Sequence, residues 1–215
     1  MKSIIYLLLI FCFFLSSCSE NPQKKAKKLH DRAIFMALND KYNSKITAIQ
    51  LLTEATDLQP DYYAAYANKL IFQRELGLYD DAFSTLITMG QLKPKNPDLQ
   101  SIIGAFYEYH NKDTLQAIIK YEEADLLYNL ILDTIKFYSP MYRDIIIHYV
   151  MNLRLLKPTF ETITILNSLF KNYDCNYDNK HEYETLKKML SELIEKQSRD
   201  QLLISKFFTP IGSIW

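Results

Sequence analysis

The chain has 215 residues, and its 25 basic side chains balance its 25 acidic ones. A domain that binds nucleic acid is usually strongly basic, so this balance argues against nucleic acid as a partner. The length is sufficient for one well-formed hydrophobic core.

The first residues have the three parts of an export signal. Lys2 supplies a positive charge, residues 4–15 form an unbroken apolar run, and two serines then precede Cys18. This run of 12 residues is too short for a transmembrane helix, which needs roughly 20. A charged start, a short apolar core and small residues before a cleavage site are typical of a secretory signal.

The segment Leu15-Ser16-Ser17-Cys18 resembles the lipobox of bacterial lipoproteins. This resemblance implies that residues 1–17 are a signal peptide, that Cys18 receives a diacylglycerol, and that residues 18–28 are the lipidated cysteine and a short linker. Two or three acyl chains hold a protein at a membrane almost permanently. The alternative is an ordinary signal peptide in which Cys18 occurs by chance.

The residues after Cys18 bear on the location of the protein. Enteric lipoproteins kept in the inner membrane carry aspartate directly after the cysteine, and this chain has Ser19. We therefore expect a protein of the outer membrane. We expect it on the periplasmic face, because the lysines that follow do not resemble the acidic surface-export tags of some bacteria. Four lysines (Lys24, Lys25, Lys27 and Lys28) follow, and they either attract anionic headgroups or form a solvated helical turn.

Cysteine usage excludes an internal disulfide in the mature chain. Cys12 would leave with the signal and Cys18 would carry lipid, so that Cys175 is the remaining thiol. The fold must then depend on its apolar core.

The pattern of apolar residues predicts an all-α protein. Apolar side chains recur at spacings of three and four, and the chain has only four glycines. A shift of 34 residues also aligns the chain with itself, pairing Ala48 with Ala82, Leu52 with Leu86, Leu58 with Leu92 and Pro60 with Pro94.

Residues 63–94 resemble a tetratricopeptide (TPR) repeat. Tyr66 occupies its first aromatic position, Gly77 and Tyr79 mark the turn, and Ala82 and Leu86 belong to the second helix. The resemblance is weaker over residues 29–124 and is extended beyond them by continuation. It implies a right-handed α-solenoid of TPR-like helix pairs over residues 29–198.

The second half of the chain predicts further helices in order. A long helix begins at Thr114 and runs towards Ile135, and Ser139 caps another helix that starts at Pro140. A partner helix follows Lys157-Pro158. Residues 172–179 form a polar loop, and residues 181–197 form an amphipathic helix that caps the solenoid.

Residues 199–215 form a tail that is too apolar for a free terminus. Its large side chains include Phe207, Phe208 and Trp215. The preferred interpretation is that the tail packs under the capping helix. The other is that it folds back onto the repeat surface, into the groove.

The sequence shows no pattern of catalysis, and we expect no enzyme, cofactor or metal. A nucleophile elbow, a zinc-protease pair and a phosphate-binding loop are all missing. The four histidines (His30, His110, His148 and His181) have no shared spacing. The loop 174–178 resembles a calcium loop, but Asn179 stands where glycine is needed and Thr185 where a carboxylate is needed.

The repeat resemblance implies a concave groove lined by the first helix of each pair. The candidate partner-binding residues are Asn68, Ile71, Arg74, Ala105 and Glu108. Small residues with scattered charge favour a bulky apolar segment of a protein or peptide partner. We therefore expect an interaction or assembly scaffold of the cell envelope, and the alternative is a lipoprotein that binds an envelope glycan or a small ligand.

Overall fold

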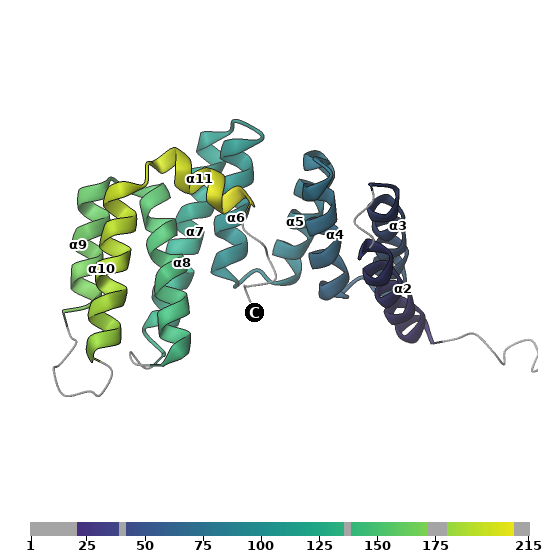
Figure 1. Ribbon diagram of the computed structural model, residues 1–215, viewed down its shortest axis with the longest axis horizontal. Helices are drawn as coiled ribbons and strands as arrows, with labels where there is room; N and C mark the ends of the chain where they lie inside the picture. The colour runs from purple at the N-terminus through teal and green to yellow at the C-terminus, as the bar shows by residue number, and fades with distance from the viewer. Residues whose placement is uncertain (1–20, 39–41, 136–138, 172–179, 209–215) are drawn as a thin grey trace, which may run out of the picture. The chain divides into compact units, whose positions relative to one another are not determined.

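A computed structural model of the chain describes residues 21–38, 42–135, 139–171 and 180–208 (Figure 1). All regular secondary structure in these ranges is helical, which confirms the predicted all-α class. The chain divides into two units, Met1–Leu78 and Tyr79–Trp215. None of the helices in the described ranges is both long and apolar enough to cross a bilayer.

The first unit contains α2 (Pro22–Ala37), α3 (Tyr42–Leu58) and α4 (Tyr63–Glu75), which pack in chain order. The Asn21 side chain caps α2 by accepting a hydrogen bond of 2.9 Å from the Gln23 amide, and Pro22 fits the first turn. The first helix therefore begins inside the segment predicted as a linker. The core of this unit is rich in alanine, which lets helices approach closely; it comprises Ala26, Ala33, Ala48, Leu51, Leu52, Ala55 and Ala65.

Gly77 ends α4 in the way the sequence predicts. Its φ is +72°, a left-handed conformation that costs glycine little. The amides of Gly77 and Leu78 donate to the carbonyls of Arg74 and Gln73, at 3.0 and 2.8 Å. These bonds satisfy carbonyls that would otherwise be unpaired at the helix end.

The second unit contains α5 to α11. Their bounds are α5 Tyr79–Leu92, α6 Pro97–Tyr109, α7 Thr114–Leu132, α8 Pro140–Leu156, α9 Thr159–Leu169, α10 Lys180–Lys196 and α11 Arg199–Phe208. Helices α5 to α10 pack against their neighbours in sequence, and α11 instead returns to α6 and α8 (Figure 1).

The predicted helix starts in this unit agree with the structure. Ser139 caps α8, because its hydroxyl accepts a hydrogen bond of 3.1 Å from the Tyr142 amide. Asn96 does the same for α6 through the Leu99 amide. Both caps are followed by a proline in the first turn.

Gly104 sets the distance between α6 and α7. A Cβ atom at this position would lie 2.6 Å from Cε1 of Tyr121 and 3.1 Å from the carbonyl oxygen of Ala117. Ala105 and Ala117 are fully buried beside it. The two helices are therefore closer than any residue larger than glycine allows.

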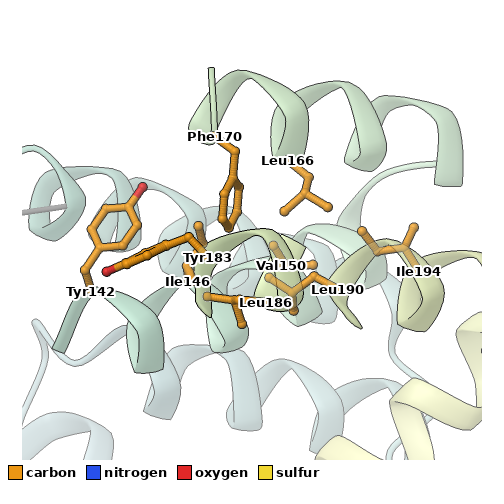
Figure 2. Packing of buried hydrophobic residues seen from close by; sticks show 9 residues of the cluster. All are labelled: Tyr142, Ile146, Val150, Leu166, Phe170, Tyr183, Leu186, Leu190 and Ile194. Carbon is orange, nitrogen blue, oxygen red and sulfur yellow. The ribbon is translucent and has the colours of Figure 1, made fainter. Parts of the chain in front are cut away.

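The amphipathic stripe predicted on residues 181–197 is buried against α8 and α9. Figure 2 shows this cluster: Tyr142, Ile146, Val150, Leu166, Phe170, Tyr183, Leu186, Leu190 and Ile194. Leu193, which the sequence places in the same stripe, instead lies beside a second cluster that contains residues of α11. Helix α10 thus covers the α8–α9 pair, as expected of a capping helix.

The repeat with the clearest pattern spans the junction of the two units. Its first helix, α4, belongs to one unit and its second helix, α5, to the other. The right-handed TPR-like solenoid stays a prediction.

Candidate partner-binding surface

Three of the predicted groove residues lie on α4 of the first unit. The Asn68 side-chain nitrogen lies 2.9 Å from Nε2 of His30 on α2 and donates to the Ala64 carbonyl at 3.1 Å. Ile71 is half-buried, and Arg74 is buried. Their role in binding a partner stays a prediction.

The other two predicted groove residues lie on α6, and α11 covers them. Ala105 is fully buried in a cluster with Leu202 and Leu203 of α11. The side chain of Glu108 is only 11% exposed. Helix α11 of the same chain therefore covers the face formed by α6 and α8, each the first helix of its pair.

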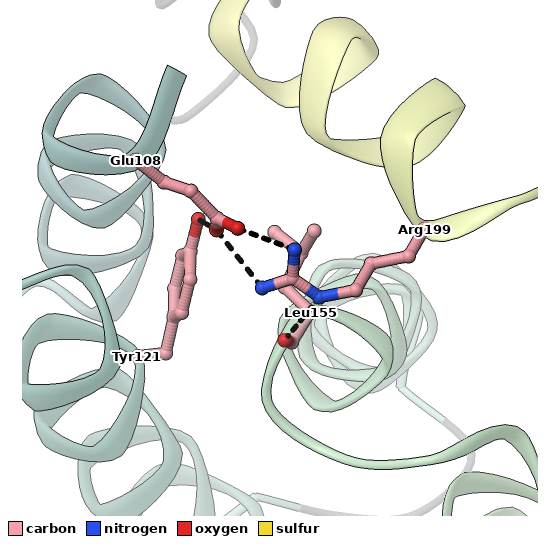
Figure 3. A network of polar contacts seen from close by, with 4 residues as sticks. All are labelled: Glu108, Tyr121, Leu155 and Arg199. Carbon is pink, nitrogen blue, oxygen red and sulfur yellow. Dashed lines mark hydrogen bonds and ion pairs between the residues drawn. The ribbon is translucent and has the colours of Figure 1, made fainter. Parts of the chain in front are cut away.

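Arg199 holds the first turn of α11 on this face (Figure 3). Its Nη2 donates to Oε2 of Glu108 at 2.9 Å, its Nη1 donates to Oε1, and its Nε donates to the Leu155 carbonyl of α8 at 3.1 Å. The Tyr121 hydroxyl completes the group by donating to the same carboxylate at 3.0 Å. A forked, charge-assisted pair of this kind fixes both position and orientation.

The surroundings of Arg199 and Tyr121 keep each of these side chains in one protonation state. The hydrogen bond to Glu108 raises the pKa of Arg199, which outweighs the effect of its partial burial. Burial, together with the neighbouring Glu108 charge, raises the pKa of Tyr121. The guanidinium therefore stays charged and the phenol stays a donor across the physiological range.

Phe207 fills an aromatic pocket further along α11. Its side chain is fully buried. Its ring centroid lies 4.4 Å from that of Phe106, 4.6 Å from that of Tyr109 and 5.3 Å from that of Tyr79, all in tilted arrangements. Such geometry adds specific ring contacts to the burial of apolar area.

Lys206 lies beside a second carboxylate of α6. It is 2% exposed, and its Nζ lies 3.9 Å from Oδ1 of Asp98. The same oxygen accepts a hydrogen bond of 2.5 Å from the Tyr128 hydroxyl and lies 3.0 Å from Nδ1 of His148. Two cations of α11 therefore face two carboxylates of α6.

The pKa values at this second site reflect burial and charge. Burial lowers the pKa of Lys206, and the nearby Asp98 offsets this only in part. Burial alone would raise the pKa of Asp98, but the hydrogen bond from His148 and the charge of Lys206 outweigh it and lower the pKa. Asp98 is thus ionised, and burial destabilises the positive charge of Lys206.

Sequence comparison supplies no relative. No protein-family model matches the chain, and no curated protein matches it. Its function must be argued from its own residues.

The apolar tail follows the less favoured of the two predicted interpretations. The preferred one, packing under the capping helix, is wrong for the main contacts of α11, which lie on α6 and α8; Leu193 of α10 also packs against its apolar cluster. Folding back onto earlier helices is confirmed for Phe207, whose ring packs against α5 and α6, and the groove stays a prediction. The Phe208 side chain and Trp215 lie outside the described residues.

Sequence reasoning missed Arg199 and Lys206 as partners of α6. The one signal in the sequence was that α11 combines spaced cations with apolar residues, which suits a helix that binds acidic and apolar groups together. Nothing in the sequence indicated which helix it would contact.

His30 and His110, two of the histidines that the sequence singles out, belong to different units. Cys18, Cys175 and the loop 174–178 lie outside the described residues. His30 lies beside Asp31 and Asn68 in the first unit, while His110 pairs with Asp80 in the second. In the ranges that the structure describes, no group of three or more His, Cys, Asp or Glu side chains could hold a metal ion.

Proposed function

We propose that the chain is a lipid-anchored protein of the bacterial cell envelope, held by Cys18 on the periplasmic face of the outer membrane, and that it acts as a protein-interaction or assembly scaffold. The partner binds a face formed by the first helices of the helix pairs. The observation that carries this proposal is that the face of α6 and α8 already binds a helix, through a forked arginine pair and an aromatic pocket.

The anchor would hold the first unit near the membrane. Four peptide links join Cys18 to Pro22, where α2 begins, and they reach at most roughly 15 Å. Lys24, Lys25 and Lys27 are exposed on α2. Near an anionic surface each lysine adds about 1 kcal/mol of attraction.

The glycan-binding alternative has less support. Sugar rings stack on exposed aromatic side chains, whereas the structure buries Tyr121, Tyr128, Tyr142, Tyr149 and Tyr183 in its cores. The pocket around Phe106 is filled by Phe207. Phe35 on α2 and Phe160 on α9 are exposed, at 69% and 79%, but they belong to different units.

The anchor is tested by fractionation of cells that express the chain. The wild-type protein is expected in the detergent phase with the mass of the acylated chain. Cys18→Ser is expected to lack the acyl mass and, once its signal segment is removed, to enter the aqueous phase. Cys175→Ser is the matched control, because it removes the one other cysteine outside the signal segment, and it should behave as wild type. Equal partitioning of wild type and Cys18→Ser would contradict the anchor.

The scaffold role is tested by cross-linking in intact cells, followed by purification from detergent-solubilised membranes. One or a few envelope proteins are expected in stoichiometric amounts. Charge reversal at exposed residues of the second unit distant from α11, such as Glu182→Lys, is the control and should retain them. Recovery of bound glycan without any protein would replace the scaffold by the ligand-binding alternative.

A further inference from the structure

We propose that α11 is a resident ligand, and that the partner protein replaces it with a helical segment of the same chemistry: an arginine, two apolar residues three and four positions later, and an aromatic residue eight positions after the arginine. These positions correspond to Arg199, Leu202, Leu203 and Phe207. The inference rests on the proposed function, since it specifies the partner that such a scaffold would take.

The contacts of α11 have the composition of a protein–protein interface. The cluster between α8, α9 and α10 gathers aliphatic and aromatic side chains (Figure 2). The α11 contact combines an apolar patch, one aromatic anchor and two charged pairs. Figure 3 shows one of these pairs, Arg199 with Glu108. An apolar centre with aromatic and arginine anchors is the usual composition of an interface.

The connection between α10 and α11 is short, exposed and held by local hydrogen bonds. Only Gln197 and Ser198 separate the two helices, and both are exposed. The Ser198 hydroxyl accepts a hydrogen bond from the Gln201 amide, and its own amide donates to the Gln201 side chain. The cap of α11 is thus local, and the helix carries it along when it moves.

The fit of α11 is incomplete at its second cation, which leaves room for a better ligand. The Lys206 ammonium is 3.9 Å from Asp98, too far for a hydrogen bond. On the same face of α6, between Asp98 and Ala105, the fully buried Ser101 hydroxyl has no hydrogen-bond partner among the described residues. Buried polar groups without partners weaken binding. A partner that satisfies these groups would therefore outcompete α11.

The experiment converts α11 into a separable peptide after the protein has folded. A protease site is inserted between Gln197 and Ser198 of the full chain, which keeps the Ser198 cap, and the purified protein is then cut. A fluorescent synthetic peptide of residues 198–208 is added, and its anisotropy is measured. The peptide should bind the cut protein saturably. It should bind the uncut protein far more weakly, because a tethered α11 competes at an effective concentration of about millimolar.

Peptide variants test the proposed chemistry. Arg199→Ala and Phe207→Ala are each expected to weaken binding by about 10-fold or more, since one loses charged hydrogen bonds and the other the aromatic anchor. Ile204→Ala is the matched control: Ile204 is 43% exposed on α11, and its truncation should change binding less than about twofold. Glu108→Gln in the protein should weaken the wild-type peptide and leave the Arg199→Ala peptide little affected.

Three results would overturn the inference. The cut protein could lose its helical circular dichroism signal, which would make α11 an indispensable part of the fold. The released segment could fail to exchange with the peptide. The Arg199→Ala and Ile204→Ala peptides could bind equally well. These failures are distinct from failure of the scaffold role, which is judged by envelope proteins cross-linked to the uncut chain.

Discussion

Substitution of Gly104 by alanine tests the close approach of α6 and α7. The added methyl group would lie 2.6 and 2.8 Å from two ring atoms of Tyr121 and 3.1 Å from a backbone oxygen of α7. The ring cannot swing away easily, because Tyr121 is fully buried and its hydroxyl is bonded to Glu108. Gly90→Ala is the matched control in the same unit, since its methyl group meets only the terminal Cδ1 of Ile103, at 2.8 Å.

Both substitutions gain helix propensity, and they differ in the steric cost of the added methyl group. Alanine in a helix interior gains about 1 kcal/mol over glycine. Overpacking at Gly104 costs about 2–3 kcal/mol, because a ring and a helix backbone must both shift. We therefore expect Gly104→Ala to lower the free energy of unfolding by about 1–2 kcal/mol. For Gly90→Ala the shift of one methyl group is offset by the helix gain, so we expect a change within about 0.5 kcal/mol.

The assay is urea denaturation followed by circular dichroism, with the midpoints compared at equal slope. Gly104→Ala should also weaken binding of the 198–208 peptide to the cut protein, because the displaced Tyr121 ring moves its hydroxyl away from Glu108. If Gly104→Ala is as stable as Gly90→Ala, the close contact of α6 and α7 does not exist as described.

Two further predictions concern buried charge and helix capping. Asp98→Ala should destabilise the second unit by about 3 kcal/mol, because it leaves the Lys206 ammonium buried without a counter-ion, whereas Lys206→Met should change stability by less than about 1 kcal/mol. Between the lowered pKa of Lys206 and its ordinary value of 10.5, the unfolded chain binds more protons than the folded one. The free energy of unfolding of wild type should therefore rise with pH relative to that of Lys206→Met. Urea midpoints from pH 7 upwards measure this difference. A difference that stays constant with pH would contradict the burial of a charged lysine. Ser139→Ala should lower the free energy of unfolding by about 1 kcal/mol, because the α8 cap is lost. Ser168→Ala, at an exposed position on α9, is the control and should cause no measurable change in thermal or urea unfolding. Equal effects of the two substitutions would argue against the cap.

Local features of the fold were predictable because neighbouring residues determine them. The cap at Ser139, the left-handed turn at Gly77 and the apolar stripe of α10 depend on residues within a few positions, and the structure contains all three. Helix periodicity likewise indicated the long α7. In each case, the physical cause and its sequence pattern lie in the same short segment.

The candidate surface was only partly predictable, because its decisive contacts join distant parts of the chain. Glu108 and Ala105 were identified from the repeat pattern, but their partners Arg199 and Leu202 come from a segment without a repeat. A pattern with a period of 34 residues describes how successive helices pack, and it contains no information on a helix that returns to an earlier one. For the same reason, it did not indicate that the chain divides after Leu78.

The return of α11 to α6 also imposes an order of events during synthesis. Arg199 is 91 residues beyond Glu108, so a ribosome adding about 5–20 residues per second makes the carboxylate roughly 5–20 seconds before its partner. In the first unit, by contrast, each helix packs against one just completed. The acidic and aromatic face of α6 is therefore synthesised before the helix that covers it, and during this interval a chaperone that binds the nascent chain meets no competition from α11.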